Sequence, residues 1–184
     1  EVLKNIDFSI SRGDKISLVG KNGTGKSTLI KSIVKDISFN GEVIHGHNIN
    51  VGYFAQDETT KLDPNKTVFQ TIDDVAVGEI RKKIRQILGS FLFSGDDVEK
   101  KVKVLSGGEK TRLSLCKLLL EPYNFLILDE PTNHLDIVSK EILKEALERY
   151  TGTLMIVSHD RDFLDGLTDK VFYIKNKELK IYLE

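Results

Sequence analysis

Apolar and polar residues follow two different rhythms along this chain. Short apolar runs predict buried strands, and segments in which apolar residues recur every three or four positions predict amphipathic helices. We predict strands at residues 15–19, 51–54, 125–128, 154–157, 171–174 and 179–183. We predict helices at residues 29–34, 68–72, 80–88, 110–121 and 139–148, and a short one at 163–164. Strands that alternate with helices favour an α/β domain on a mainly parallel sheet, which we expect to carry an antiparallel β edge.

Two further strands are predicted at residues 6–10 and 42–45. Residues 6–10 alternate between apolar and polar, which is the period of a half-buried strand, and residues 42–45 follow the turn signal Asn40-Gly41. His45 and His47 have no Cys, Asp or Glu at ligand spacing, so we interpret them as solvated turn residues rather than metal ligands.

The segment from Gln56 to about Lys103 differs from the rest of the chain. Residues 57–66 are polar and contain a proline, which predicts a loop, and the apolar residues of 80–88 recur at i, i+4, i+7 and i+8. The opposite face of that predicted helix is basic, with Arg81, Lys82, Lys83 and Arg85. A solvated surface is the plainer interpretation of this basic face, and a contact with RNA or a partner is the alternative. We therefore predict a small helical subdomain at about residues 57–121, within one domain that spans residues 1–184.

Composition narrows the class of protein. At 184 residues the chain is long enough for a core of its own, and a net charge of −1 gives no overall nucleic-acid footprint. Cys116 is the single cysteine and lies in an apolar stretch, so a buried thiol is predicted and no disulfide is possible. Without a signal peptide or a run of 18 apolar residues, we expect no direct membrane insertion and a cytoplasmic location. The chain opens on Glu1 rather than Met, and we expect it to be part of a longer protein.

A phosphate-binding loop is the clearest chemical signal. Residues Gly20-Lys21-Asn22-Gly23-Thr24-Gly25-Lys26-Ser27-Thr28 fit G-x-x-x-x-G-K-[ST] between a predicted strand and a predicted helix. The glycines let backbone N–H groups turn toward phosphate oxygens, and the helix N-terminus adds partial positive charge. We expect Lys26 to contact the β- and γ-phosphates of a nucleotide and the Ser27 hydroxyl to bind Mg²⁺. A glycine-rich turn with a surface lysine is the alternative at this point.

Four other groups of residues stand where a P-loop ATPase would use them. Asp129 and Glu130 end an apolar strand, where Asp129 would serve Mg²⁺ and Glu130 would orient or deprotonate the attacking water. Ser106-Gly107-Gly108-Glu109 opens a helix, with Ser106 as the N-cap and a second anion site at the glycines. Gln56 follows a strand and would touch both Mg²⁺ and water, and His159 at another strand end would donate to the γ-phosphate.

In this order the five elements resemble the nucleotide-binding domain of ABC ATPases over essentially the whole chain. The resemblance implies that Gln56 is the Q-loop, that Ser106-Gly107-Gly108-Glu109 is the signature motif, and that His159 is the switch histidine. It also implies that Leu135-Asp136 lies in the D-loop. In that family two domains pair head to tail, and each ATP lies between one P-loop and the other domain's signature motif. A second ABC domain is therefore the expected partner, with ATP and Mg²⁺ as ligands.

Two stretches are similar to the ABC-F branch, whose members carry two ABC domains on one soluble chain and in many cases act on the ribosome. They are Glu130-Pro131-Thr132-Asn133-His134-Leu135-Asp136 and Ser158-His159-Asp160-Arg161-Asp162-Phe163-Leu164. Residues 139–147 are similar to the second domain of such a chain. The aromatic residue that stacks on adenine and the interdomain linker of that branch would lie outside residues 1–184.

Three functions remain open at this point. The first is a translation factor that binds the ribosome and its rRNA in an ATP-bound closed state and leaves on hydrolysis. The second is the ATPase subunit of a membrane ABC transporter, and the third is a binding module that uses ATP only as a switch. The resemblance favours the first, because transporter ATPases more often carry a small residue where His134 stands. The complete set of predicted catalytic residues argues against a module that uses ATP only as a switch.

Overall fold

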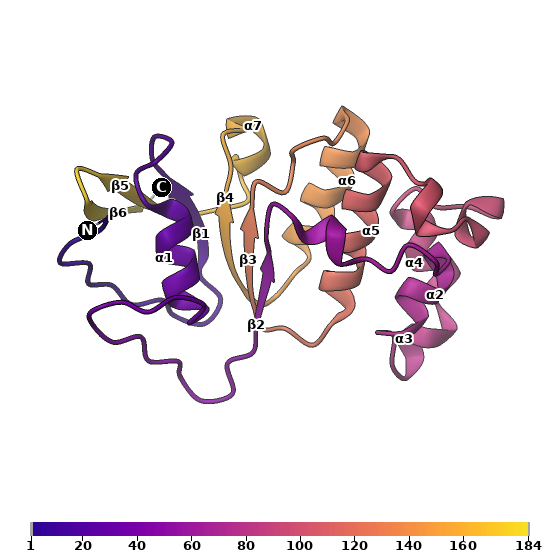
Figure 1. Cartoon of the computed structure of the whole chain (residues 1–184), viewed down its shortest axis with the longest axis horizontal. Helices are drawn as coiled ribbons and strands as arrows, with labels where there is room; N and C mark the ends of the chain where they lie inside the picture. Colours follow the sequence, from indigo (N-terminus) through magenta and orange to yellow (C-terminus); the bar gives the residue numbers. More distant parts are fainter. Residues whose placement is uncertain (1, 184) are drawn as a thin grey trace. The chain divides into compact units, whose positions relative to one another are not determined.

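Six strands form one sheet within residues 2–183, which are the residues that the computed structural model describes (Figure 1). The strands are β1 Lys15–Val19, β2 Val51–Phe54, β3 Phe125–Asp129, β4 Thr153–Val157, β5 Lys170–Lys175 and β6 Glu178–Leu183. Their order in the sheet is β2-β3-β4-β1-β5-β6, and all neighbours are parallel except β5 and β6, which are antiparallel. The predicted α/β class, a mainly parallel sheet with an antiparallel edge, is confirmed. Strands β3 and β4 are buried along their whole length, as their continuous apolar runs require.

The chain divides into two compact units. The sheet unit holds the described residues of Glu1–Phe54, Tyr123–Pro131 and Thr151–Glu184, and the helical unit consists of Ala55–Pro122 and Thr132–Tyr150. The helical subdomain that the sequence predicts at about 57–121 falls inside the helical unit, which also contains Thr132–Tyr150. No helix in the described part of the chain is long and apolar enough to span a bilayer.

In the sheet unit the core is built from the strands and from helix α1, Lys26–Ile33. Its buried residues are Ile16, Leu18, Leu29, Ile30, Ile33, Phe125, Ile127, Met155, Val157, Phe172 and Ile174. The three buried residues of α1 recur at helical spacing, so one face of the helix packs against the sheet. A second short helix of this unit, α7, covers Arg161–Leu164.

The strand predictions at residues 6–10 and 42–45 in this unit are wrong. Residues 6–10 do alternate between half-buried and exposed, and the Phe8 ring meets Phe172 edge to face at 5.3 Å. Both sides of β1 are already paired with β4 and β5, so this segment joins the core through its side chains and not through a strand ladder. Residues 42–45 form no strand, and although Val43 is half-buried, Ile44 is 78% exposed. His45 is not a solvated turn residue either, because its Nε2 lies 2.7 Å from the carbonyl oxygen of Ile33 at the end of α1.

The helical unit contains short helices around a core of its own. Its α-helices are α2 Val68–Asp73, α3 Glu79–Lys82, α4 Ile84–Ser90, α5 Gly107–Leu120 and α6 Ile137–Glu148. Its 3₁₀ helices are η1 Glu58–Lys61, η2 Gly95–Glu99 and η3 Val102–Val104. The buried residues include Val68, Ile72, Ile84, Leu88, Phe91, Phe93, Val98, Val102, Leu113 and Cys116. Burial raises the pKa of the Cys116 thiol to about 12, which makes it an inert core residue, as predicted.

One predicted helix of this unit is broken in two. Residues 80–88 do not form a single helix, because the backbone at Lys83 (φ −111°, ψ 10°) leaves the helical region between α3 and α4. Ile84 and Leu88 of α4 are buried, whereas Ile80 and Ile87 pack only partly against the same core. The predicted loop at 57–66 contains the turn η1.

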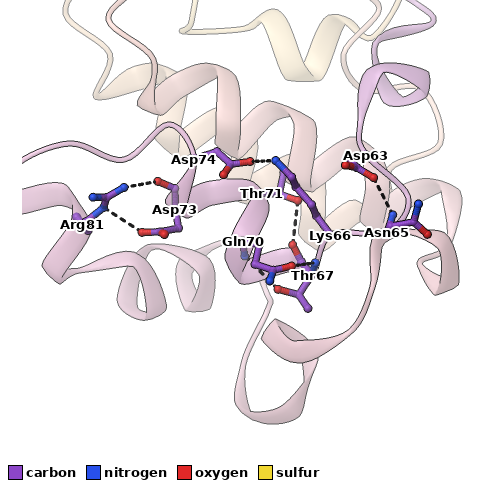
Figure 2. Close-up of polar contacts among 9 residues, drawn as sticks. All are labelled: Asp63, Asn65, Lys66, Thr67, Gln70, Thr71, Asp73, Asp74 and Arg81. Carbon is purple, nitrogen blue, oxygen red and sulfur yellow. Dashed lines mark hydrogen bonds and ion pairs between the residues drawn. The ribbon is translucent and has the colours of Figure 1, made fainter.

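Ion pairs neutralise most of the basic face that the sequence shows on α3 and α4. Arg81 pairs with Asp73 of α2 at 3.0 Å and also donates to its carbonyl oxygen (Figure 2). Lys82 pairs with Glu79 at 2.8 Å, and Arg85 pairs with Glu99 at 2.9 Å. Figure 2 also shows Lys66 paired with Asp74, and Thr67 and Gln70 forming a capping box at the start of α2. This pairing supports a solvated surface rather than an RNA contact for the basic face.

The half-buried ion pair between Asp14 and Lys170 offers a test of the sheet unit's stability. Burial by itself would raise the pKa of Asp14, but hydrogen bonds from Lys170 Nζ (2.8 Å) and the Ser11 N–H (2.9 Å) lower it. A carboxyl with a lowered pKa stabilises the fold above its unfolded pKa of about 4 and loses that contribution as the pH falls through the folded pKa. We expect Asp14→Asn to lower the free energy of unfolding by roughly 1–2 kcal/mol at pH 7. The difference should shrink below pH 4 in urea titrations, and an equal loss at pH 7 and pH 3 would contradict this account.

Candidate active site

Three segments of the sheet unit meet at the carboxyl edge of neighbouring strands. The P-loop follows β1, Asp129 ends β3, and His159 follows β4. Strands β3, β4 and β1 are adjacent and parallel, so their carboxyl ends share one edge of the sheet. Ligands of open α/β sheets bind at this edge. The sheet therefore brings together the residues that the sequence assigns to a nucleotide site from three distant parts of the chain.

The P-loop has the conformation that its glycines permit. Gly25 caps α1 with φ 104°, and Gly23 has φ 78°, both in the left-handed region. Gly20 is needed for a steric reason instead, because a Cβ there would lie 2.9 Å from the Ile174 carbonyl oxygen. Lys26 reaches back over the loop and donates from Nζ to the carbonyl oxygens of Gly20 (2.7 Å) and Lys21 (3.1 Å).

The remaining P-loop residues stand at the loop and the first turn of α1. Lys21 and Asn22 are exposed in the turn, and Thr24 Oγ1 donates to the Lys21 carbonyl oxygen at 2.8 Å. Ser27 is exposed in the first turn of α1, and the Thr28 carbonyl oxygen accepts from Ser32 Oγ at 2.9 Å.

The two acids at the end of β3 have different surroundings. Asp129 is 4% exposed, and Tyr53 of β2 donates to its Oδ2 at 3.5 Å. Burial raises the pKa of Asp129, while Tyr53 and the positive charges of Lys26 and Lys31 oppose the rise. A cation bound beside this carboxylate would favour its ionised form.

Glu130 stands in a strained backbone position. Its φ is 51°, in the left-handed region that a glutamate rarely adopts, and its N–H donates to the Val157 carbonyl oxygen at 2.8 Å. That bond to β4 aims the side chain toward His159, whose Nε2 lies 3.2 Å from Glu130 Oε1. Burial raises the pKa of Glu130, with the His159 ring opposing the rise, so the carboxylate is a stronger base than an exposed glutamate. His159 itself is largely exposed and thus open to a ligand.

The residues of the P-loop and of the end of β3 fit a nucleoside triphosphate with Mg²⁺. The loop has no room for side chains at Gly20, and its lysine lies over the backbone that would surround phosphate oxygens. Ser27 and Asp129 offer the hard oxygen ligands that Mg²⁺ prefers. Within residues 2–183 no cluster of three or more His, Cys, Asp or Glu side chains would hold a metal by itself.

A second group of predicted residues lies in the helical unit. Ser106 caps α5 in a capping box: its Oγ accepts from the Glu109 N–H (3.2 Å), and Glu109 Oε2 accepts from the Ser106 N–H (2.8 Å). The predicted N-cap is thereby confirmed, and the carboxylate of Glu109 serves the cap. Gln56 stands two residues after the end of β2 and before η1.

The Thr132–Asp136 turn packs against the first turn of α5. A Cβ at Gly108 would lie 3.0 Å from the carbonyl oxygen of His134, which itself has φ 66°. Leu135 donates from its N–H to the Thr132 carbonyl oxygen at 3.1 Å, and Asp136 Oδ1 accepts from the Ser139 N–H at 2.7 Å to cap α6. The predicted signature motif and the predicted D-loop residues are thus neighbours within one unit.

Two residues that contact the predicted site residues or their neighbours, Tyr53 and Arg112, belong to none of the sequence motifs. Tyr53 contacts Asp129 from the adjacent strand, and only the alternation within 51–54 indicates which way its side chain points. Arg112 of α5 reaches Ser139 of α6, and its helix period alone does not reveal this partner. Both contacts depend on which elements become neighbours in space.

Comparison with known proteins identifies relatives over nearly the whole chain. Residues 3–133 match the ABC transporter family. The putative ATP-binding protein YdiF of Bacillus subtilis is 47% identical over 183 residues, which are 99% of this chain and 28% of that protein. ABC transporter F family member 5 of Arabidopsis thaliana is 44% identical, over 98% of this chain and 26% of its own length. The chain thus spans about a quarter of the length of these curated relatives.

Solved structures share the fold. The dimeric structure of MJ0796, a bacterial ABC transporter cassette, superposes with a TM-score of 0.82 over 99% of this chain and 90% of that one, at 21% identity.

Proposed function

The chain belongs to the ABC family of ATPase domains, in the F branch, and we propose that it hydrolyses Mg²⁺-bound ATP in composite sites formed with a second ABC domain. The observation that carries this proposal is the gathering of Lys26, Asp129, Glu130 and His159 at one edge of one sheet. We further propose that this domain is the second of two on a longer chain, and that the protein works on the ribosome in the cytoplasm.

The roles that we propose follow from the contacts of each side chain. Glu130 accepts the proton of the attacking water, because it is the partly buried base beside His159. Lys26 and His159 bind the γ-phosphate, and the backbone N–H groups of Gly20–Thr28 bind the other phosphate oxygens. Ser27 and Asp129 of the sheet unit would hold Mg²⁺, which would neutralise phosphate charge, and the family resemblance alone adds Gln56 as a proposed ligand.

The signature motif is the part of the proposed site that acts on the other domain's ATP. The first N–H groups of a helix have no partner within the helix, and the Ser106 hydroxyl occupies only that of Glu109. The N–H groups of Gly107 and Gly108 thus remain for an anion, with no side chain of their own to block it. We propose that Ser106, Gly107, Gly108 and Glu109 close the site on the ATP of the partner domain, where they add charge stabilisation.

Action on the ribosome is the finer part of the proposal. It is supported by the F branch and by the turn Thr132-Asn133-His134-Leu135-Asp136, in which His134 stands where transporter ATPases more often carry a small residue. The ATPase subunit of a membrane transporter is the second candidate function. The ion-paired basic face on α3 and α4 does not support direct RNA binding there, so we expect the ribosome to be contacted by other parts of the protein.

Ribosome co-sedimentation of the full-length protein carrying Glu130→Gln tests the proposal. We expect pelleting with ribosomes in ATP and not in ADP, because the variant would hold ATP and the closed state. The matched control is the same protein with a second change, Lys26→Ala, which should weaken ATP binding and therefore reduce pelleting at ATP concentrations near the wild-type Kd. Absence from the pellet in both nucleotides, with ATP binding intact, would reject the ribosome and favour the transporter alternative.

A further inference from the structure

Arg112 connects three parts of the helical unit. Its Nη1 donates to Ser139 Oγ of α6 at 3.1 Å, and its guanidinium lies over the Phe93 ring, 5.1 Å from the ring centroid. Phe93 is 1% exposed in the core of the unit. A planar guanidinium suits this position, because one face stacks on the ring while an edge donates.

The residue that Arg112 contacts also belongs to the cap of α6. Ser139 is 2% exposed, its N–H donates to Asp136 Oδ1, and its Oγ accepts from Arg112. The hydrogen bonds from Ser139 lower the pKa of Asp136, and the positive charge of Arg112 lowers it further. The start of α6, which follows the Thr132–Asp136 turn, is therefore tied to α5 through Arg112.

The same turn meets α5 at a second point. The His134 carbonyl oxygen lies where a Cβ of Gly108 would be only 3.0 Å away. Arg112 thus holds the turn from one side, while Gly108 allows its close approach to the first turn of α5. Arg112 Nε is shielded from solvent without a hydrogen-bond partner among the described residues, an arrangement that has a free-energy cost.

We propose that Arg112 is a positioning residue, which locks the Thr132–Asp136 turn to the first turn of α5 so that both meet a partner domain's nucleotide as one body. This inference rests on the composite site proposed above. It assigns to Arg112 a role in closing that site and none in binding ATP at the chain's own P-loop.

The test compares Arg112→Met with Arg85→Met in the full-length protein. Arg85 is the matched control, because it also lies over an aromatic ring (Phe69, 5.3 Å) and pairs with an acid, Glu99, but these partners belong to α2 and η2 and not to the turn, α5 or α6. We expect Arg112→Met to lower kcat about tenfold to a hundredfold through misplacement of the signature motif. Its dissociation constant for ATP should stay within about twofold of wild type, and Arg85→Met should keep both constants.

A second readout separates positioning from a general loss of structure. In the Glu130→Gln background, bound ATP that survives a rapid chase with unlabelled ATP reports the closed site. Arg112→Met should reduce this retained ATP at least about fivefold, and Arg112→Lys should not restore it, because an ammonium cannot both stack and donate in the same plane. Ser139→Ala removes only the acceptor oxygen and should lower kcat in the same direction, with a melting temperature near that of wild type.

Wild-type kcat and ATP retention in both Arg112→Met and Ser139→Ala would overturn the proposal. A parallel fall in melting temperature, ATP affinity and kcat would also overturn it, by showing a merely structural role. Failure of the composite site itself has a different signature, since the Glu130→Gln protein would then retain no ATP with Arg112 intact.

Discussion

Replacement of Glu130 by glutamine is expected to lower the rate of ATP hydrolysis by about 10²–10⁴-fold, the range for loss of a general base. Glutamine has the same shape but cannot accept the proton of the attacking water. The backbone of Glu130 is held by its bond to the Val157 carbonyl oxygen, and this bond survives the substitution. ATP affinity should therefore stay close to wild type, because the P-loop is unchanged. The protein should accumulate with ATP bound and the two domains closed.

Single-turnover hydrolysis and equilibrium binding of labelled ATP measure the two quantities separately. Glu178→Gln is the matched control, since it makes the same chemical change at an exposed position of the same unit, in β6. It should leave both quantities unaltered. Turnover of Glu130→Gln near the wild-type rate would remove Glu130 from its proposed role as the base.

Most strands of the sheet can be predicted from the sequence, because they are apolar runs too short to form buried helices. Strands β3 and β4 lie within one residue of prediction, and their burial is complete. The P-loop and the Ser106 cap can also be predicted from the sequence, since a glycine at positive φ and a capping box each depend on only a few neighbouring residues. The antiparallel edge of β5 and β6 also follows from local order, through the short connection between them.

The failed predictions share one feature, which is that periodicity does not by itself determine how the backbone is hydrogen-bonded. Residues 6–10 have the correct period for a strand, but both neighbouring places beside β1 are taken by β4 and β5. Residues 80–88 have the correct period for one helix, yet burial of Ile84 and Leu88 coexists with a break at Lys83. Periodicity tells which side chains are buried and leaves open how the backbone achieves it.

The candidate sites follow the same division. Lys26, Asp129, Glu130 and His159 were all identified from motifs, and the parallel strands explain why they meet. Their neighbours were not identified, because a contact such as Tyr53 with Asp129 joins two strands that are far apart in the sequence. The left-handed φ of Glu130 is likewise invisible in the sequence. The bond to β4 holds the backbone in this strained conformation, and the strain agrees with the catalytic role that we propose for Glu130.

Replacement of Lys26 by alanine is expected to weaken ATP binding by about 10- to 100-fold, the value of losing one or two charge-assisted hydrogen bonds. Lys26 donates to the carbonyl oxygens of Gly20 and Lys21, so its ammonium already lies over the loop that would bind the phosphates. Alanine removes both the charge and the contact that joins the start of the loop to α1. The rise in melting temperature that ATP produces should therefore be clearly smaller than in the wild-type protein at the same ATP concentration, since ligand stabilisation depends on the ratio of concentration to Kd.

Lys31→Ala provides the comparison that isolates this effect. Lys31 is an exposed lysine in the last turn of the same helix, and its loss changes the net charge equally. Calorimetric titration should give an ATP affinity near wild type for Lys31→Ala and a much weaker one for Lys26→Ala. Equal losses in the two variants would mean that overall charge, and not the geometry of the loop, controls binding. The phosphate contacts proposed for Gly20–Thr28 would then lose their support, because a loop of this shape with its lysine in place should distinguish the two positions.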